Sequence, residues 1–204
     1  HVIVLSSGGD RTFCAGASFD ELITITNSED GKKFFLGFAH AINAMRKCPK
    51  IIICRVHGKA IGGGVGIAAA ADYCMATNYG TIKLSELALG IGPFVIGPAV
   101  ERKIGLSAFS QLALNATEWQ TAIWAKEKGL YHEVFDSIEQ LDAYVDELSQ
   151  RLAATSSSAL LALKQALWHD TQHWDQLLEE RAGISGRLVI TEASQKAIRE
   201  SKIV

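Results

Sequence analysis

The sequence predicts an α/β fold with a mainly parallel sheet, followed by a helical C-terminal region. Two patterns typical of buried strands, residues 2–5 and 51–56, flank a long amphipathic helical pattern. Strand, helix and strand in this order indicate a β-α-β crossover between parallel strands. From Ser137 onward the chain carries only helical patterns. We therefore expect an α/β core over residues 1–136 and a helical region over residues 137–204.

The elements of the core follow from local patterns. Residues 2–5 (VIVL) and 51–56 (IIICRV) are almost wholly apolar and suit strands buried on both faces. Apolar residues recur every three or four positions over 31–45, which predicts a helix with one buried face. Residues 6–10 are turn-forming, and residues 13–18 predict a loop of small residues. An alanine-rich helix to about residue 71 and strands at 73–76 and 81–85 complete this part.

The second half is predicted to be mostly helical. Short helices are expected at 106–114 and 121–128, with Gly129 as the C-terminal cap, and a last strand at 131–135. Longer helices are expected at 137–154, 156–169 and 171–188, each beginning at Ser or Thr. Trp168 and Trp174 are expected to pack in the core or between subunits.

Composition excludes several classes of protein. The 204 residues include 20 basic and 22 acidic side chains, so no basic surplus indicates nucleic acid. The longest uncharged apolar stretch, residues 60–71, is shorter than the roughly 20 residues of a membrane span. Four cysteines without a CxxC pair predict free thiols, a cytoplasmic location and no metal site. The chain begins inside a strand pattern, from which we expect that an N-terminal piece is missing.

Two glycine-rich loops are the first candidates for chemistry. Residues 14–18 and 58–64 are expected at the carboxyl ends of strands, where open α/β sheets bind ligands. The second loop opens a helix, whose free N–H groups favour developing negative charge. Two N–H groups that converge on one carbonyl oxygen would form an oxyanion hole. The alternative is that these glycines serve only tight turns and close packing.

The ionisable candidates are few. Glu86 ends a predicted strand and lies in an apolar run. Apolar surroundings would raise the pKa of its carboxyl group toward the range of a general base. The alternative is that Glu86 forms a salt bridge at the end of the strand and has no chemical role. His57 is expected at a strand end with its ring satisfied, and His169 and His173 on a solvated helix surface. Residues 64–69 also fit G-x-G-x-x-A, with Glu86 at a plausible distance for a ribose-binding acid. This leaves a dinucleotide-dependent oxidoreductase as a competing interpretation.

Three segments resemble the crotonase (enoyl-CoA hydratase/isomerase) superfamily. Residues 13–18 (FCAGAS) are similar to its F-x-A-G-A-D loop, residues 57–64 (HGKAIGGG) to N-G-x-A-x-G-G-G, and residues 85–93 (SELALGIGP) to P-E-x-x-L-G-x-x-P. Asp72 also stands where the family usually has Asp. The order and spacing of the segments agree, and the resemblance covers essentially the whole chain.

The resemblance implies a spiral of β-β-α units, acyl-CoA thioester substrates and no cofactor besides the CoA of the substrate. The C-terminal helices would serve oligomerisation, as a homotrimer or a dimer of trimers. By position, the N–H groups of Ala17 and Gly63 would form the oxyanion hole, and Glu86 would be the catalytic acid or base. The substrate and its CoA would be bound by Cys14, Ala15, Gly16, Ala17, Ser18, Phe19, Asp20, Gly62, Gly63 and Gly64.

The sequence departs from the family at the second hydratase glutamate, whose place is taken by Gly66. Hydration normally uses two carboxylates, whereas isomerisation needs one base that moves a proton, so isomerisation is favoured. A non-catalytic acyl-CoA-binding protein is the alternative. Ser18 replaces the family's Asp, and Phe94, Val95 and Ile96 replace small residues, which predicts an unusual or short acyl group. Glu101 is a further candidate to replace the missing acid.

Overall fold

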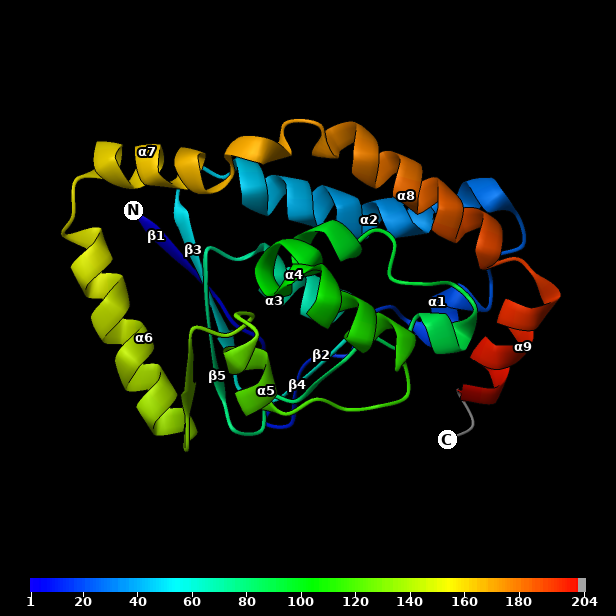
Figure 1. Cartoon of the computed structure of the whole chain (residues 1–204), viewed down its shortest axis with the longest axis horizontal. Helices are drawn as coiled ribbons and strands as arrows, with labels where there is room; N and C mark the ends of the chain where they lie inside the picture. Colours follow the sequence, from blue (N-terminus) through cyan, green and yellow to red (C-terminus); the bar gives the residue numbers. More distant parts are fainter. Residues whose placement is uncertain (202–204) are drawn as a thin grey trace.

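A computed structural model describes residues 1–201 and shows three successive β-β-α units (Figure 1). The first unit contains β1 (Val2–Leu5), β2 (Thr12–Cys14), α1 (Phe19–Leu22) and α2 (Ser28–Lys47). The second contains β3 (Ile51–Val56), β4 (Lys59–Ile61) and α3 (Gly63–Ala70). The third contains β5 (Tyr73–Thr77), β6 (Ile82–Lys83), the 3-10 turn η1 (Leu87–Leu89) and α4 (Gly97–Leu114). The expected β-β-α spiral is therefore confirmed.

The strands form two parallel sheets. The first strand of each unit, with β7 (Glu133–Phe135), builds a four-stranded sheet in the order β1-β3-β5-β7. The second strands build a three-stranded sheet in the order β2-β4-β6. The predicted parallel pairing is confirmed, although the strands form two sheets and not one. The prediction that residues 13–18 lie wholly in a loop was wrong, because Phe13 and Cys14 belong to β2. Strands of three residues, such as β2 and β4, are too short to show period-two alternation and exist through pairing with distant segments.

The four-stranded sheet is covered on both faces. Ile52, Cys54 and Val56 of β3 belong to the main hydrophobic core, on the side of α2, α3 and α4. Ile51 and Ile53 point the other way, toward α6 (Ile138–Ala153). Successive side chains of a strand alternate between faces, so this distribution explains why the β3 sequence is apolar throughout.

The C-terminal helices are α5 (Ala122–Glu127), α6, α7 (Ser157–Leu167), α8 (Trp174–Leu188) and α9 (Glu192–Ser201), with the 3-10 turn η2 (His169–Thr171) before α8. The predicted caps at Ser137 and Ser156 are confirmed, because each side chain accepts a hydrogen bond from the N–H three residues on, and Thr121 caps α5 in the same way. The predicted cap at Thr171 was wrong, because His173 is the residue that precedes α8. Gly129 follows α5 with φ of 87°. Helix α9 was not predicted, and residues 202–204 of the predicted helical region lie outside the described residues.

Two helix starts differ from the predictions. Helix α4 begins at Gly97, nine residues before the predicted start, with Pro98 in its first turn, where proline is favoured. Gly105, with φ of 75°, interrupts it, and only the part after this kink was predicted. Helix α8 begins at Trp174 because residues 169–171 form η2 instead. No helix within residues 1–201 combines the length and apolarity that crossing a bilayer requires.

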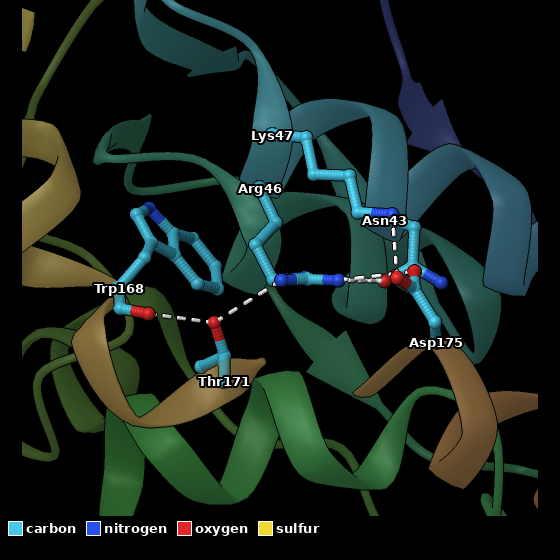
Figure 2. A network of polar contacts seen from close by, with 6 residues as sticks. All are labelled: Asn43, Arg46, Lys47, Trp168, Thr171 and Asp175. Atoms are coloured by element: carbon cyan, nitrogen blue, oxygen red, sulfur yellow. Dashed lines mark hydrogen bonds and ion pairs between the residues drawn. The ribbon is translucent and has the colours of Figure 1, made fainter. Parts of the chain in front are cut away.

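Helices α2 and α8 lie side by side along one edge of the molecule (Figure 1). Figure 2 shows the polar contacts that join the end of α2 to the start of α8. Arg46 donates to Asp175 at 3.1 Å and to Asn43 at 2.9 Å, and Lys47 donates to the same Asp175 carboxylate at 2.6 Å. Asp175 stands in the first turn of α8, where negative charge is favoured. These contacts fix the register of the two helices.

Candidate active site

The two glycine-rich loops meet backbone to backbone. Gly16 has φ of 83°, and a Cβ placed on it would lie 2.8 Å from Ile61 O and 3.3 Å from Gly63 N. A Cβ on Gly64 would likewise lie 2.5 Å from Cys14 O. Only glycine permits such approaches, so the alternative that these glycines serve turns and close packing holds for Gly16 and Gly64. The same packing brings Ala17 and Gly63 to one place.

Gly63 is the first residue of α3, and the first N–H groups of a helix have no partner within it. Gly62 precedes it with φ of 52°, and its N–H donates to Lys83 O at 2.8 Å, which ties this turn to β6. Gly63, at the positive end of α3, and Ala17 line the same cavity.

These loops open on a cavity of about 50 Å³. Its polar lining side chains are Glu86, Ser85 and Ser185. The remaining lining is backbone or apolar: Ala15, Gly16, Ala17, Phe19, Leu22, Phe35, Phe38, Gly62, Gly63, Leu89, Ile91, Gly92, Pro93, Phe94, Val95 and Ile96. A space of this size holds a few waters or a small, mainly apolar group.

Glu86 is held between β6 and η1 by its own backbone. Its carbonyl accepts hydrogen bonds from Leu89 N at 3.1 Å and Ile91 N at 3.0 Å. A Cβ on Gly62 would lie 2.8 Å from Glu86 Oε1, so the carboxylate rests against the Gly62 backbone. Glu86 Oε2 is buried and has no hydrogen-bond partner among residues 1–201. The salt-bridged strand end is therefore excluded for the part of the chain that the structure describes.

The environment of Glu86 changes its acidity. Burial raises the pKa of Glu86 to about 7, and a hydrogen bond from its own backbone N–H offsets part of this rise. Burial has this effect because the charged form loses its hydration. A carboxyl group with a pKa near 7 can accept a proton and give it back at neutral pH.

Gly66 lies on the second turn of α3, under Ile96. A Cβ on Gly66 would lie 2.5 Å from Ile96 Cγ2 and 2.6 Å from Ile96 Cβ. Ile96 is buried and lines the cavity together with Phe94 and Val95. Ile96, one of the bulky residues singled out in the sequence, thus fills the place that a side chain at position 66 would take.

The other predicted binding residues are distributed around the cavity. Ser18 lies outside it, in a neighbouring open groove that also borders Gly16 and Ala17. Its hydroxyl accepts from Glu21 N at 3.3 Å and caps α1, a role that Asp would also fill. Cys14 and Gly64 are packed against each other, and Asp20 stands in the first turn of α1; none of these three is among the cavity-lining residues.

Several other candidates lie outside the site. Glu101 is exposed on α4, and His169 is exposed and paired with Asp170 at 2.7 Å. Within residues 1–201, no cluster of histidine, cysteine or acidic side chains has a metal-binding arrangement. His57 is buried at the end of β3, and both of its ring nitrogens lack partners in the described chain. The expectation that its ring is satisfied was wrong, because no group of residues 1–201 forms a hydrogen bond with either ring nitrogen.

Phe38 and Ser185 are lining residues that sequence reasoning did not assign to the site. Phe38 belongs to the apolar stripe of α2, and nothing in that stripe separates a core position from a cavity position. Ser185 belongs to α8, far along the chain, and reaches the cavity because α8 packs on α2. The sequence feature that could have identified Ser185 is its place as a lone small polar residue on a buried helix face.

Comparison with known proteins agrees with this architecture. The sequence profile described as enoyl-CoA hydratase/isomerase matches residues 1–203. The chain belongs to the enoyl-CoA hydratase/isomerase family, which is the crotonase superfamily that the three segments resemble. The fold has a TM-score of 0.87 to a crystal structure of enoyl-CoA hydratase from Bacillus halodurans, at 21% identity over 98% of this chain and 81% of that one.

Two curated relatives carry different activities in their names. The chain is 28% identical to the peroxisomal Delta(3,5)-Delta(2,4)-dienoyl-CoA isomerase of Arabidopsis thaliana, over 81% of this chain and 63% of the relative. It is 31% identical to an enoyl-CoA hydratase of Alternaria alternata, over 78% of this chain and 52% of the relative. The chain therefore spans between half and two thirds of the length of these relatives.

Proposed function

We propose that the protein is a one-base enoyl-CoA isomerase, which moves a double bond of an acyl-CoA thioester from position 3 to position 2. One observation carries the proposal: Glu86 is the single carboxylate that lines the cavity within residues 1–201. It stands beside the junction of the two glycine loops, with a pKa of about 7.

The N–H groups of Ala17 and Gly63 are proposed to donate hydrogen bonds to the thioester oxygen. The close approach of Gly16 to Gly63 and the start of α3 at Gly63 support this role. Negative charge on that oxygen would grow as the enolate forms, and the N–H groups would stabilise it where water is excluded. Each such donor contributes roughly a hundredfold to a thousandfold in rate.

Glu86 is proposed to carry the proton. The ionised carboxylate removes a proton from C2 of the 3-enoyl thioester, and the electron pair of that C–H bond delocalises over the double bond and the thioester carbonyl. The protonated Glu86 then gives the proton to C4, and the double bond forms between C2 and C3. The proton count is conserved, and the reaction needs no second acid and no redox partner.

Hydration is disfavoured by the contact between Gly66 and Ile96. A second carboxylate at position 66 would be needed to activate water, and Ile96 fills the volume above Gly66. The mostly apolar lining likewise leaves few partners for an attacking water.

The acyl-CoA substrate class is proposed from family membership and from the names of the relatives. The CoA portion is proposed to run along residues 14–20, and no additional cofactor is needed for the chemistry.

We also propose a homotrimer or a dimer of trimers, in a cytoplasmic setting. Exposed leucines on α7 support a subunit contact there: Leu161, Leu163 and Leu167. Sedimentation equilibrium tests the assembly, and a monomer would contradict it.

The decisive experiment compares isomerisation of 3-enoyl-CoA with hydration of 2-enoyl-CoA in the same preparation. We expect isomerisation without efficient hydration in the wild type, and a loss of roughly 10²–10⁴-fold in Glu86→Gln. Glu101→Gln, which changes an exposed glutamate on α4, is the matched control and should keep full activity. Efficient hydration, or isomerisation that survives in Glu86→Gln, would overturn the proposal. Tight binding of acyl-CoA without turnover would instead identify a non-catalytic binding protein.

A further inference from the structure

Phe38 stands between the cavity and the open groove on the surface. The cavity holds Glu86, and the groove runs between residues 16–25 and α2. Three residues border both spaces: Gly16, Ala17 and Phe38. Of these, only Phe38 has a large side chain, so its ring is the main side-chain partition between the two.

The position of this ring is set by Gly63. A Cβ on Gly63 would lie 2.1 Å from Phe38 Cε1 and 2.4 Å from Phe38 Cζ, so the ring lies directly against the Gly63 backbone. Phe38 itself is only half-buried, in contrast to its neighbour Phe35. The ring therefore covers the start of α3 on one side and borders the open groove on the other.

The cavity walls away from Phe38 are formed mainly by side chains that are buried in the core. Ile96 is held against Gly66, and Leu22, Leu89 and Ile91 are all buried in the main core. Ser185 closes the cavity from α8, which packs along α2 and has Gly186 in close contact with Gly31. Among the large half-buried apolar side chains that line the cavity of about 50 Å³, namely Phe19, Phe38, Pro93 and Phe94, Phe38 is the one that also borders the groove. An acyl chain that outgrows the cavity toward the groove therefore meets Phe38.

The lining of the groove suits a hydrocarbon chain better than an anion. Its apolar members include Ile25, Phe34 and Ile67. Its ionisable members are Glu21, Asp30 and Lys33, two acids against one base. The phosphates of a CoA molecule carry several negative charges and would be repelled by Glu21 and Asp30, so this part of the groove, beyond the CoA path proposed along residues 14–20, is left to the acyl chain.

We propose that Phe38 limits the acyl-chain length of the substrate by closing the passage from the cavity into the groove. This inference rests on the proposed function, since it concerns the acyl group of the same thioester. When the ring is removed, the groove becomes an extension of the acyl site, and longer chains gain buried apolar contact. Each methylene so buried is worth roughly a fourfold change in affinity.

The test measures kcat/KM for a series of 3-enoyl-CoA substrates, from about four to about twelve carbons, at one pH and salt concentration. In Phe38→Ala we expect the ratio of the values for long and short chains to rise about tenfold or more over the wild type. Phe38→Leu, a milder change, should give a smaller rise, and it covers the case in which the alanine variant folds poorly. Because the ratio of kcat/KM for long and short chains is taken within one variant, it cancels any loss of activity that affects every substrate equally, such as a loss caused by a displaced Gly63.

Phe34→Ala is the matched control, because Phe34 borders the groove but not the cavity. It should leave the chain-length profile of the wild type unchanged. An unchanged profile in Phe38→Ala would overturn the inference, as would the same shift in both variants. A KM that changes equally for every chain length, together with a changed inhibition constant for free CoA, would assign the groove to CoA instead. Failure of the wild type on every thioester would overturn the proposed function itself.

Discussion

Lys164 Nζ lies 2.8 Å from Asp72 Oδ2, and both side chains are only 3% exposed. Lys164 also donates to Met45 O at 2.8 Å and to Lys50 O at 2.9 Å. Asp72 accepts in addition from Trp168 Nε1 at 2.7 Å and from Ile52 N at 2.8 Å. This buried ion pair is fully hydrogen-bonded, and it ties α7 to the end of α2 and the start of β3.

Removing one member of this pair should be costly. Lys164→Met leaves the Asp72 carboxylate buried without its counter-charge, and we expect the free energy of unfolding to fall by about 3–5 kcal/mol. Urea denaturation followed by far-UV circular dichroism measures this change. The matched control is Lys196→Met on α9, where Lys196 and Glu200 form an exposed pair and the expected change is about 0–1 kcal/mol. Equal effects of the two substitutions would contradict the role of the buried pair.

Glu86 should reduce stability at the pH at which it works. Its pKa is about 7 in the folded protein, against an ordinary value of 4.5 for the exposed side chain, so the folded state binds more protons between these values. Stability is therefore expected to fall as pH rises from about 4.5 to 7. Glu86→Gln should be more stable than the wild type at pH 8, by up to about 3 kcal/mol, and similar at pH 4.5. Thermal unfolding at both pH values tests this, and a stability difference that does not vary with pH would refute it.

Restoring a glutamate at position 66 should not by itself produce a hydratase. Gly66→Glu places a side chain where Ile96 already lies, so we expect loss of stability of about 1–3 kcal/mol and no gain in hydration. Gly66→Glu combined with Ile96→Ala frees that volume and should recover stability and permit measurable hydration of 2-enoyl-CoA. Ile96→Ala alone is the control for the enlarged cavity. Hydration by the single Gly66→Glu variant would show that Ile96 does not block the position.

Gly63 and Phe38 should show coupled effects on stability. Gly63→Ala introduces a Cβ at 2.1 Å from the Phe38 ring, and we expect destabilisation of about 1–3 kcal/mol from this overlap. In the Phe38→Ala background the added Cβ no longer meets its three nearest atoms, which all belong to the Phe38 ring, and the substitution should cost much less. A double-mutant cycle in urea measures the coupling. Additive effects of the two substitutions would mean that the contact is relieved by other movements.

His57 should make the protein sensitive to mild acid. Burial lowers its pKa below the ordinary value of 6.5, and the nearby Arg55 adds to this effect. Below pH 6.5 the unfolded chain takes up a proton more readily than the folded one, so stability is lost as pH falls through this range. His57→Asn should reduce the loss between pH 7 and 5. His132→Asn is the comparison, because burial also lowers the pKa of His132 and this variant measures the contribution of that second histidine separately. An unchanged pH profile of stability in His57→Asn would exclude His57 as a source of the acid sensitivity.

Local patterns predicted the elements that local chemistry determines. The apolar β3, the striped α2 and the caps at Ser137 and Ser156 depend on neighbouring residues and were found where expected, whereas the cap expected at Thr171 was not. Strands β2 and β4 were missed because three residues gain strand structure only from partners far along the chain. The same limit applies to the site, in which Glu86 and the glycine loops were predictable. Packing between distant segments places Ile96 against Gly66, and it also brings Phe38 and Ser185 to the cavity wall. These features could not be predicted from local patterns.

The position of Ser185 in the cavity wall has a consequence for biosynthesis. Glu86 and the glycine loops leave the ribosome well before α8, roughly 100 residues ahead of it, which corresponds to about 5–20 s of translation. During that interval the buried face of α2 has no α8 to cover it, and the cavity lacks one wall. The nascent chain thus exposes an unfinished apolar pocket and an uncovered helix face until α8 emerges. Chaperones that bind exposed apolar segments would act on the chain in this window, before the site is complete.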